Sequence, residues 1–257
     1  MDLIHTLILS LVEGVTEFLP ISSTGHLILA SHALGIHETN FVKSFEIIIQ
    51  LGAILAVVVL YWRTLLFKRA YWPKIILAFL PTAVVGFTLY PLIKGVLLSS
   101  PDVTLTSLFV GGVILIAIEK FHIEKDSHAA SIDSISNKQA FFIGCFQSLS
   151  VIPGVSRAAA TIVGGMLTGA KRTAAVEFSF LLAVPTMVAA SGLDLIKSHS
   201  HFTSSEVTTL LIGFVASFIV ALIVIRYFLQ FIKHHSFVPF GIYRILLALV
   251  YWLVLIR

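Results

Sequence analysis

The sequence predicts an all-α integral membrane protein with six transmembrane helices and two re-entrant helical hairpins, arranged as an inverted repeat. Composition, the length of the apolar runs and a weak internal repeat support this fold class. Of the 257 residues, 58% are hydrophobic and 12% are charged, whereas soluble domains are about 45–50% apolar and about a quarter charged. Together with a mean hydropathy of +1.00, this composition indicates a chain that folds in a bilayer.

Six apolar runs predict the transmembrane helices. A helical span needs roughly 20 residues, and flanking positions can supply a few of them. The runs are continuously apolar, whereas the strands of a membrane barrel alternate, so helices are favoured. The expected spans are residues 45–62, 75–93, 105–118, 174–193, 207–225 and 240–256.

A weak internal repeat predicts one membrane domain built from two inverted repeats, residues 1–125 and 137–257. The segment FLPISSTG at 18–25 aligns with VIPGVSRA at 151–158, and VKSFEIIIQLGAILA aligns with TAAVEFSFLLAVPTM at nearly the same spacing. Each repeat holds a short polar element followed by three spans. Because three is odd, the second repeat must cross the membrane in the opposite sense, as in many transporters.

The two short polar elements predict re-entrant hairpins. The stretch from Pro20 to Gly35 has only 16 residues, and SSTG interrupts it; the stretch from Pro153 to Gly169 is similar. Non-helical backbone at membrane depth is tolerated only inside protein or beside a water-filled cavity. Each element is therefore expected to enter as a helix, turn at its Pro-Ser motif and return to the same side.

The basic residues predict the orientation of the chain in the membrane. On this topology, eleven lysines and arginines fall in loops on one side and four on the other, which is a positive-inside bias. It places the first hairpin and both termini outside, and the second hairpin enters from the cytoplasm. The net charge of +4 then reflects basic cytoplasmic loops, and nucleic-acid binding is not expected.

Glu13 and Glu17 are candidate metal ligands. They lie four residues apart on one face of an apolar helix, where two carboxylates repel each other and lose solvation unless a cation neutralises them. A hard divalent cation, Mg²⁺ or Ca²⁺, suits oxygen ligands of this kind. The alternative is a structural pair that hydrogen-bonds to neighbouring helices.

Ser22, Ser23, Thr24 and Gly25 mark a helix start and are candidate substrate-binding residues. Free N–H groups and the positive end of the helix dipole favour an anion there, although simple capping is the alternative. His26 follows Ser23 by three residues, so the imidazole and the hydroxyl are expected to approach each other. A serine with a nearby histidine is typical of an activated nucleophile or a proton relay.

Arg157 in the second hairpin is the one arginine expected deep in the membrane beside a helix start. A guanidinium group binds phosphate through paired hydrogen bonds, and an unpaired arginine at such a depth would be costly. The alternative is an ion pair with a glutamate of the first hairpin or of a long helix, namely Glu13, Glu17, Glu46 or Glu177. Both roles can hold at once.

Four further polar residues are expected to support the site from behind: Glu46, Gln50, Gln147 and Glu177. Together, a metal held by acids, two helix starts, an arginine and a serine–histidine pair describe phosphoryl transfer or phosphate hydrolysis. Positioning and charge neutralisation do most of the catalytic work in such reactions. The apolar surroundings imply a lipid-borne substrate.

Several segments resemble one known family, the bacterial undecaprenyl-diphosphate phosphatases linked to bacitracin resistance. The resemblance covers essentially the whole chain and is carried by EGVTEFLPISSTGHL, FEIIIQLGAILAV, PGVSRAAAT and EFSFLLAVP. It implies hydrolysis of undecaprenyl diphosphate to the monophosphate at the outer face of the bacterial plasma membrane, with a divalent metal as cofactor. That reaction recycles the lipid carrier for peptidoglycan synthesis.

The resemblance also implies which residues form the site. By motif match they are Glu13, Glu17, Ser23, Thr24, His26, Ser156, Arg157 and Thr161. We expect Ser23 to be the nucleophile with His26 as its base, although His26 itself or water could attack instead. Where the family pattern has Ser-Gly after the arginine, this chain has Ala158-Ala159, which removes a hydroxyl and a flexible glycine.

Two other functions stay open at this point. Inverted repeats with re-entrant hairpins are transporter architecture, so the protein could move the lipid carrier phosphate across the membrane. The Ala158-Ala159 departure leaves a non-catalytic lipid-binding homologue as a third option. The sequence does not decide the oligomeric state, and a homodimer is one of the options.

Overall fold

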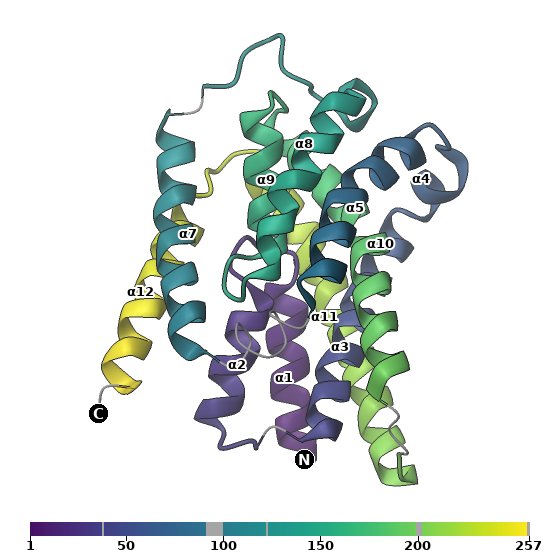
Figure 1. Cartoon of the computed structure of the whole chain (residues 1–257), viewed down its shortest axis with the longest axis vertical. Coiled ribbons are helices and arrows are strands. Elements are labelled where there is room, and N and C mark those ends of the chain that lie inside the picture. The colour runs from purple at the N-terminus through teal and green to yellow at the C-terminus, as the bar shows by residue number, and fades with distance from the viewer. Residues whose placement is uncertain (38, 91–99, 122, 199–201, 256–257) are drawn as a thin grey trace.

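A computed structural model describes residues 1–37, 39–90, 100–121, 123–198 and 202–255 (Figure 1). Its regular elements over these residues are helical, apart from one isolated bridge between Ala129 and Ala170. The elements are α1 (Leu3–Thr16), α2 (Ser23–Ala33), α3 (Asn40–Leu60), α4 (Trp62–Phe67), α5 (Tyr71–Thr88), α7 (Pro101–Phe121), η2 (Ile132–Ser134), α8 (Asn137–Gln147), η3 (Ser148–Val151), α9 (Arg157–Leu167), α10 (Arg172–Ser198), α11 (Ser204–Ile232) and α12 (Val238–Leu255).

Among the described residues, five helices are long and apolar enough to cross a membrane: α3, α5, α7, α10 and α11. They correspond to the first five predicted spans, although residues 91–93 of the second lie outside the described residues. The sixth prediction falls on α12, an apolar helix that is shorter in its described part; residue 256 lies outside that part. Large apolar side chains such as Phe87 on α5, which is 76% exposed, face outward as in lipid contact. The chain is therefore an all-helical, multi-pass membrane protein.

Two pairs of short helices lie between the long ones. In Figure 1 the pair α1–α2 enters from the lower end of the molecule and the pair α8–α9 from the upper end, and their turns meet near the centre. Helices α2 and α9 have 11 residues each, or about 16 Å of helix. The hydrocarbon core of a bilayer is about 30 Å thick, so neither helix is long enough to cross it.

The short helices α2 and α9 begin and end in matching ways. Each follows a serine with positive φ, Ser22 at 73° and Ser156 at 74°, whose hydroxyl accepts a hydrogen bond from the backbone N–H three residues later. Each also ends at a glycine with positive φ, Gly35 at 64° and Gly169 at 91°. L-residues rarely adopt this region outside tight turns, so the shared conformation reflects the same turn built twice.

The structure corrects the register of the predicted repeat by one residue. Alignment of Pro20 with Pro153 set Ser23 opposite Ser156, whereas the matched caps set Ser23 opposite Arg157 as the first residue of each helix. The reason is an extra residue in the second turn, where Gly154 has a φ of 88°. The two first helical residues, a serine and an arginine, are therefore structurally equivalent.

Each short pair packs on a long helix from the other half of the chain. Helix α11 packs against α1 and α3, while α5 packs against α8, and α12 runs along α7. The α7–α12 contact is close because Gly112 and Gly241 face each other, and a Cβ at either would lie within 2.8 Å of the other's carbonyl oxygen. These contacts between the two halves of the chain hold the two turns together in the middle of the protein.

Candidate active site

A pocket lies where the two turns meet, so both halves of the chain contribute to it. One wall is polar and carries the first residues of α2 and α9, and Ile152 and Met187 add apolar surface. The lining residues are Glu17, Ser22, Ser23, Thr24, Ser150, Ile152, Pro153, Gly154, Ser156, Arg157, Thr186 and Met187. Most of the residues predicted from the two motifs are thus brought together.

Glu17 and Ser23 form a short hydrogen bond inside this pocket. Glu17 is the C-cap of α1 and Ser23 opens α2, so the turn between the helices folds the hydroxyl back over the carboxylate. Ser23 Oγ donates to Glu17 Oε2 at 2.5 Å, and the two residues are only 8% and 6% exposed. A carboxylate that accepts from a serine hydroxyl is placed to take its proton.

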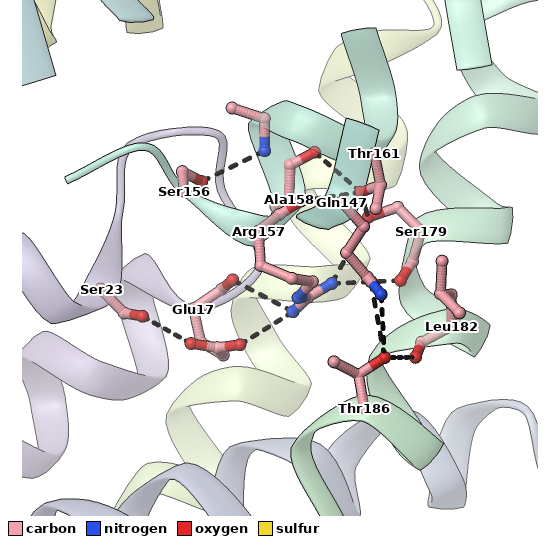
Figure 2. Close-up of polar contacts among 11 residues, drawn as sticks. Glu17, Ser23, Gln147, Ser156, Arg157, Ala158, Thr161, Ser179, Leu182 and Thr186 are labelled. Atoms are coloured by element: carbon pink, nitrogen blue, oxygen red, sulfur yellow. Dashed lines mark hydrogen bonds and ion pairs between the residues drawn. The ribbon is translucent and has the colours of Figure 1, made fainter. Parts of the chain in front are cut away.

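Arg157 binds the other oxygen of the same carboxylate, and Figure 2 shows Glu17 between Ser23 and Arg157. The guanidinium Nη2 lies 2.8 Å from Glu17 Oε1, and Nη1 donates to the Ser179 carbonyl oxygen at 3.1 Å. The ring of Phe18 lies 5.6 Å from the guanidinium carbon. Among the acids considered from sequence, Glu17 is the one that pairs with Arg157.

The starts of α2 and α9 both open onto the pocket. Ser22 and Ser156 line it, and their hydroxyls cap the two helices, at 3.3 Å and 3.1 Å from the backbone nitrogens whose N–H groups they accept from. Thr24 also lines it. Two helix N-termini that converge with an arginine make a site suited to a multiply charged anion.

The expected pairing of His26 with Ser23 is wrong. His26 Nδ1 lies 2.7 Å from the Ser22 carbonyl oxygen, so this nitrogen must carry the hydrogen, and Nε2 lies 2.8 Å from the Tyr243 hydroxyl of α12. The two rings stack with centroids 5.5 Å apart. Residues three apart share a helix face, but here the serine turns back to α1 and the imidazole turns toward α12.

Gly25 and Thr161, predicted to contact substrate, lie behind the pocket and do not line it. Gly25 supplies the N–H that Ser22 caps, and a Cβ there would lie 3.4 Å from Leu108. Thr161 is fully buried, with its hydroxyl oxygen 2.6 Å from Ser179 Oγ. Since Ser179 holds Arg157, Thr161 acts on the arginine rather than on a ligand.

Glu13 is fully buried, and neither of its carboxylate oxygens has a hydrogen-bond partner among the described residues. The carboxylates of Glu17 and Glu46 both repel it electrostatically. A buried charge without a partner is costly, so this carboxylate suits a hard cation or a bound proton. In the described part of the chain, no cluster of three or more His, Cys, Asp or Glu side chains has the arrangement of a metal site.

Only part of the predicted supporting layer surrounds the pocket. Gln147 donates to Thr82 and to Thr186, a pocket residue, so it supports the wall from behind. Glu46, on α3, lies near Glu13 of α1. Neither Glu46 nor Gln50, which is on the same helix, lines the pocket.

Glu177, predicted to support the site, lies elsewhere in the molecule. Its carboxylate lies within electrostatic range of Tyr61 and Lys233. Its neighbour two positions on, Ser179, faces Arg157 instead. Residues two apart point to different faces of a helix, which is why Glu177 turns away from the pocket.

Buried polar residues near the site that were not foreseen include Ser179, Thr186 and Arg244. Ser179 on α10 orients Arg157, and although it lies in the segment EFSFLLAVP it was not among the predicted site residues. Arg244 on α12 is fully buried, so Arg157 is not the only arginine at this depth. A lone arginine inside the apolar run 240–256 was the available signal.

Comparisons with known proteins find relatives along almost the whole chain. A family model described as bacitracin resistance protein BacA matches residues 6–250. The undecaprenyl-diphosphatase of Aquifex aeolicus (strain VF5) is 56% identical over 247 residues, which cover 96% of each chain. That of Persephonella marina (strain DSM 14350 / EX-H1) is 49% identical over 253 residues, 98% of this chain and 99% of the other.

The resemblance predicted from the motifs is thereby confirmed, and these relatives' names do not favour the transport alternative. The chain belongs to the BacA family of bacitracin resistance proteins.

Proposed function

We propose that this protein hydrolyses undecaprenyl diphosphate to undecaprenyl phosphate and inorganic phosphate. The observation that carries the proposal is one carboxylate, Glu17, held between a serine hydroxyl and an arginine where two helix N-termini converge. The relatives' name supplies the substrate, and the chemistry of the site suits a diphosphate.

The pocket supports a lipid diphosphate on both its polar and its apolar sides. The starts of α2 and α9 would receive the phosphate oxygens, and Arg157 would neutralise their charge. Arg157 Nε is buried and has no acceptor among the described residues, so a ligand oxygen would satisfy it. Ile152 and Met187 give the prenyl chain an apolar route out of the pocket.

The hydrogen bonds favour Ser23 as nucleophile and Glu17 as its base. Ser23 Oγ would attack the distal phosphorus while its proton passes to Glu17 Oε2. The bond between that phosphorus and the bridging oxygen breaks, and undecaprenyl phosphate leaves with the electron pair.

Hydrolysis of the phosphoserine would complete the cycle. Water attacks the phosphorus, the bond from phosphorus to Ser23 Oγ breaks, and the serine oxygen recovers a proton from Glu17. Inorganic phosphate carries away the oxygen of the water. Direct attack of water on the diphosphate is the alternative.

Glu13 and Glu17 would hold a divalent cation, Mg²⁺ or Ca²⁺, together with oxygens of the substrate. The orphaned carboxylate of Glu13 fits such an ion, and Mg²⁺ is commonly bound through one or two carboxylates plus substrate phosphates. The ion would supply charge neutralisation on the diphosphate. The protein itself shields Glu13 from water and orients Glu17 through Ser23 and Arg157.

Phosphate release by the purified protein tests the proposed reaction. The full chain in detergent is given undecaprenyl diphosphate and Mg²⁺, and released phosphate is measured. We expect turnover in the wild type and loss of at least 100-fold in Glu17→Ala and Arg157→Ala. No release from a monodisperse, folded wild-type sample would refute the enzyme assignment.

The nucleophile is tested by trapping a phosphoenzyme. Substrate labelled with ³²P in the distal phosphate is mixed with enzyme, quenched in acid and digested. We expect label on the peptide that contains Ser23 and none in Ser23→Ala. An active wild type that never carries label would support direct attack by water.

We also propose the inverted-repeat topology, with the first hairpin and the pocket open to the outside of the bacterial plasma membrane. The matched caps of α2 and α9 and the positive-inside bias support it. Single cysteines at exposed Ser205 and exposed Asp126, in a Cys145→Ala background, would react with an impermeant maleimide on intact cells only at Ser205. Labelling of the Asp126→Cys variant instead would show that the orientation in the membrane is the opposite one.

A further inference from the structure

Arg244 is a fully buried arginine in the middle of α12, and neither predicted motif includes it. Its guanidinium has five N–H donors, and each has a backbone carbonyl as acceptor. Nε donates to Leu108 at 3.3 Å and Nη2 donates to Ser107 at 3.1 Å, both in α7. The other three donors reach the two turns.

The three remaining acceptors come from both sides of the pocket. Nη1 donates to the carbonyl oxygens of Pro20 and Val155, each at 3.2 Å, and Nη2 donates to that of Gly154 at 2.8 Å. Pro20 belongs to the turn before α2, whereas Gly154 and Val155 belong to the turn before α9. One side chain thus bonds both turns at once.

The carbonyl groups of these turns need donors from elsewhere in the protein. Where a helix is interrupted at membrane depth, the freed backbone groups must be satisfied by protein. No carboxylate lies within ion-pair distance of Arg244 among the described residues. All five N–H donors of the guanidinium therefore bond backbone oxygens. No carboxylate of the described residues neutralises its positive charge, which lies next to the proposed anion site.

The helix that faces Arg244 leaves room for it. A Cβ on Gly111 of α7 would collide with the guanidinium, since its three nearest atoms are all in the Arg244 side chain. The space occupied by the guanidinium thus depends on a glycine at this position.

We propose that Arg244 is a positioning residue that fixes the start of α2 relative to the start of α9, and hence Ser23 and Glu17 relative to Arg157. The inference rests on the proposed hydrolysis. Ser23 and Arg157 are the first residues after the two turns, so movement of either turn changes their separation. A misplacement of about 1 Å can cost about 100-fold in rate.

Lysine does not replace arginine in this role. It has three donors on one nitrogen and no rigid fork, so it keeps the charge but cannot reach carbonyls on two turns and on α7 together. We expect Arg244→Lys to lower kcat about 100-fold, or about 2.7 kcal/mol of barrier at 1.36 kcal/mol per tenfold. The KM for undecaprenyl diphosphate should stay within threefold, because the lost geometry acts in the transition state.

Gly111→Ala tests the same idea without touching Arg244. The added methyl group displaces the guanidinium, and we expect kcat to fall at least tenfold with KM within threefold. Gly86→Ala in α5 is the matched control, because it is also a helical glycine and a Cβ there meets nothing within 4 Å. Arg226→Lys, at an exposed arginine of α11, controls for the exchange of arginine for lysine.

The assay uses the full chain in detergent, with kcat expressed per folded, monodisperse protein and Tm measured alongside. A role confined to folding would lower Tm and yield but leave kcat of the folded protein unchanged. Wild-type kcat in folded Arg244→Lys and Gly111→Ala would overturn the proposal, as would a change in KM alone or loss of folding in both variants. An inactive wild type would instead refute the hydrolysis on which the inference rests.

Discussion

Glu17→Gln is the sharpest test of the site, because Glu17 uses its two oxygens for different partners. Oε2 accepts from Ser23 at 2.5 Å and Oε1 accepts from Arg157 at 2.8 Å. A glutamine has one oxygen and one NH₂ group. The Arg157 guanidinium can only donate hydrogen bonds, so the amide oxygen must face it. The NH₂ group then faces Ser23 and donates to its hydroxyl, which reverses the direction of that hydrogen bond.

The expected loss of rate follows from the reversed bond. Ser23 would then accept from the amide and would have no base for its proton, and general-base catalysis contributes about 10²–10⁴-fold. We expect kcat to fall by that factor, equivalent to about 3–5 kcal/mol of barrier at 1.36 kcal/mol per tenfold. KM should change much less, because Arg157 stays in place.

The expected loss of stability is smaller. Breaking a buried ion pair costs about 3–5 kcal/mol when the remaining charge is left without partners. Arg157 would keep the amide oxygen and the Ser179 carbonyl at 3.1 Å, so we expect the free energy of unfolding to fall by about 1–3 kcal/mol.

The assay compares phosphate release, Tm and elution profile of Glu17→Gln with those of Glu124→Gln. Glu124 accepts from the Arg172 N–H at 2.8 Å and lies 3.9 Å from its guanidinium, away from the pocket. The control should keep the wild-type kcat. A folded Glu17→Gln protein with kcat within tenfold of wild type would refute Glu17 as the base.

Three further variants separate the roles of neighbouring residues. Arg157→Lys should lower kcat at least 100-fold, because an ammonium group cannot bond Glu17, Ser179 and a phosphate in one plane; near-normal turnover would contradict the phosphate clamp. His26→Gln should lower kcat less than tenfold, because the imidazole bonds Ser22 and Tyr243 and not Ser23, whereas a loss above 100-fold would restore His26 as a proton carrier. Glu13→Gln should need roughly tenfold more Mg²⁺ for half-maximal activity, yet have a higher Tm in EDTA because the carboxylate that Glu17 and Glu46 repel is gone; an unchanged Mg²⁺ requirement would remove Glu13 from the metal site.

Much of the fold and site follows from local patterns in the sequence. Continuous apolar runs mark the long helices, because a bilayer demands them. A proline followed within three residues by a serine interrupts such a run only where protein or water satisfies the backbone, and this motif marked both turns. Glu17, Ser23 and Arg157 could therefore be assigned to one pocket from their motifs.

The features that could not be predicted from the sequence depend on contacts between distant elements. Ser23 and His26 share a helix face by spacing, but the turn aims the serine at Glu17 and α12 captures the histidine through Tyr243. Arg244 lies over 200 residues from Pro20, whose carbonyl it binds. Helical spacing gives no information about which distant element will face a side chain.

The one-residue error in the repeat has a local cause. Two prolines made an attractive alignment, but the second turn holds Gly154 as an additional residue. An insertion of this size is invisible when identity between the halves is low, whereas a shared cap with positive φ at Ser22 and Ser156 shows it directly.

The equivalence of Ser23 and Arg157 has a consequence for the ancestry of the chain. A symmetric ancestor made from two identical copies would carry the same residue at both positions, with two matching but incomplete centres. Two copies of the present first half would bring serines and glutamates to the turns with no arginine there, and two copies of the second would bring arginines without a base. If the two halves arose by duplication, the present centre required them to diverge at these two positions, because it needs a serine at one helix start and an arginine at the other.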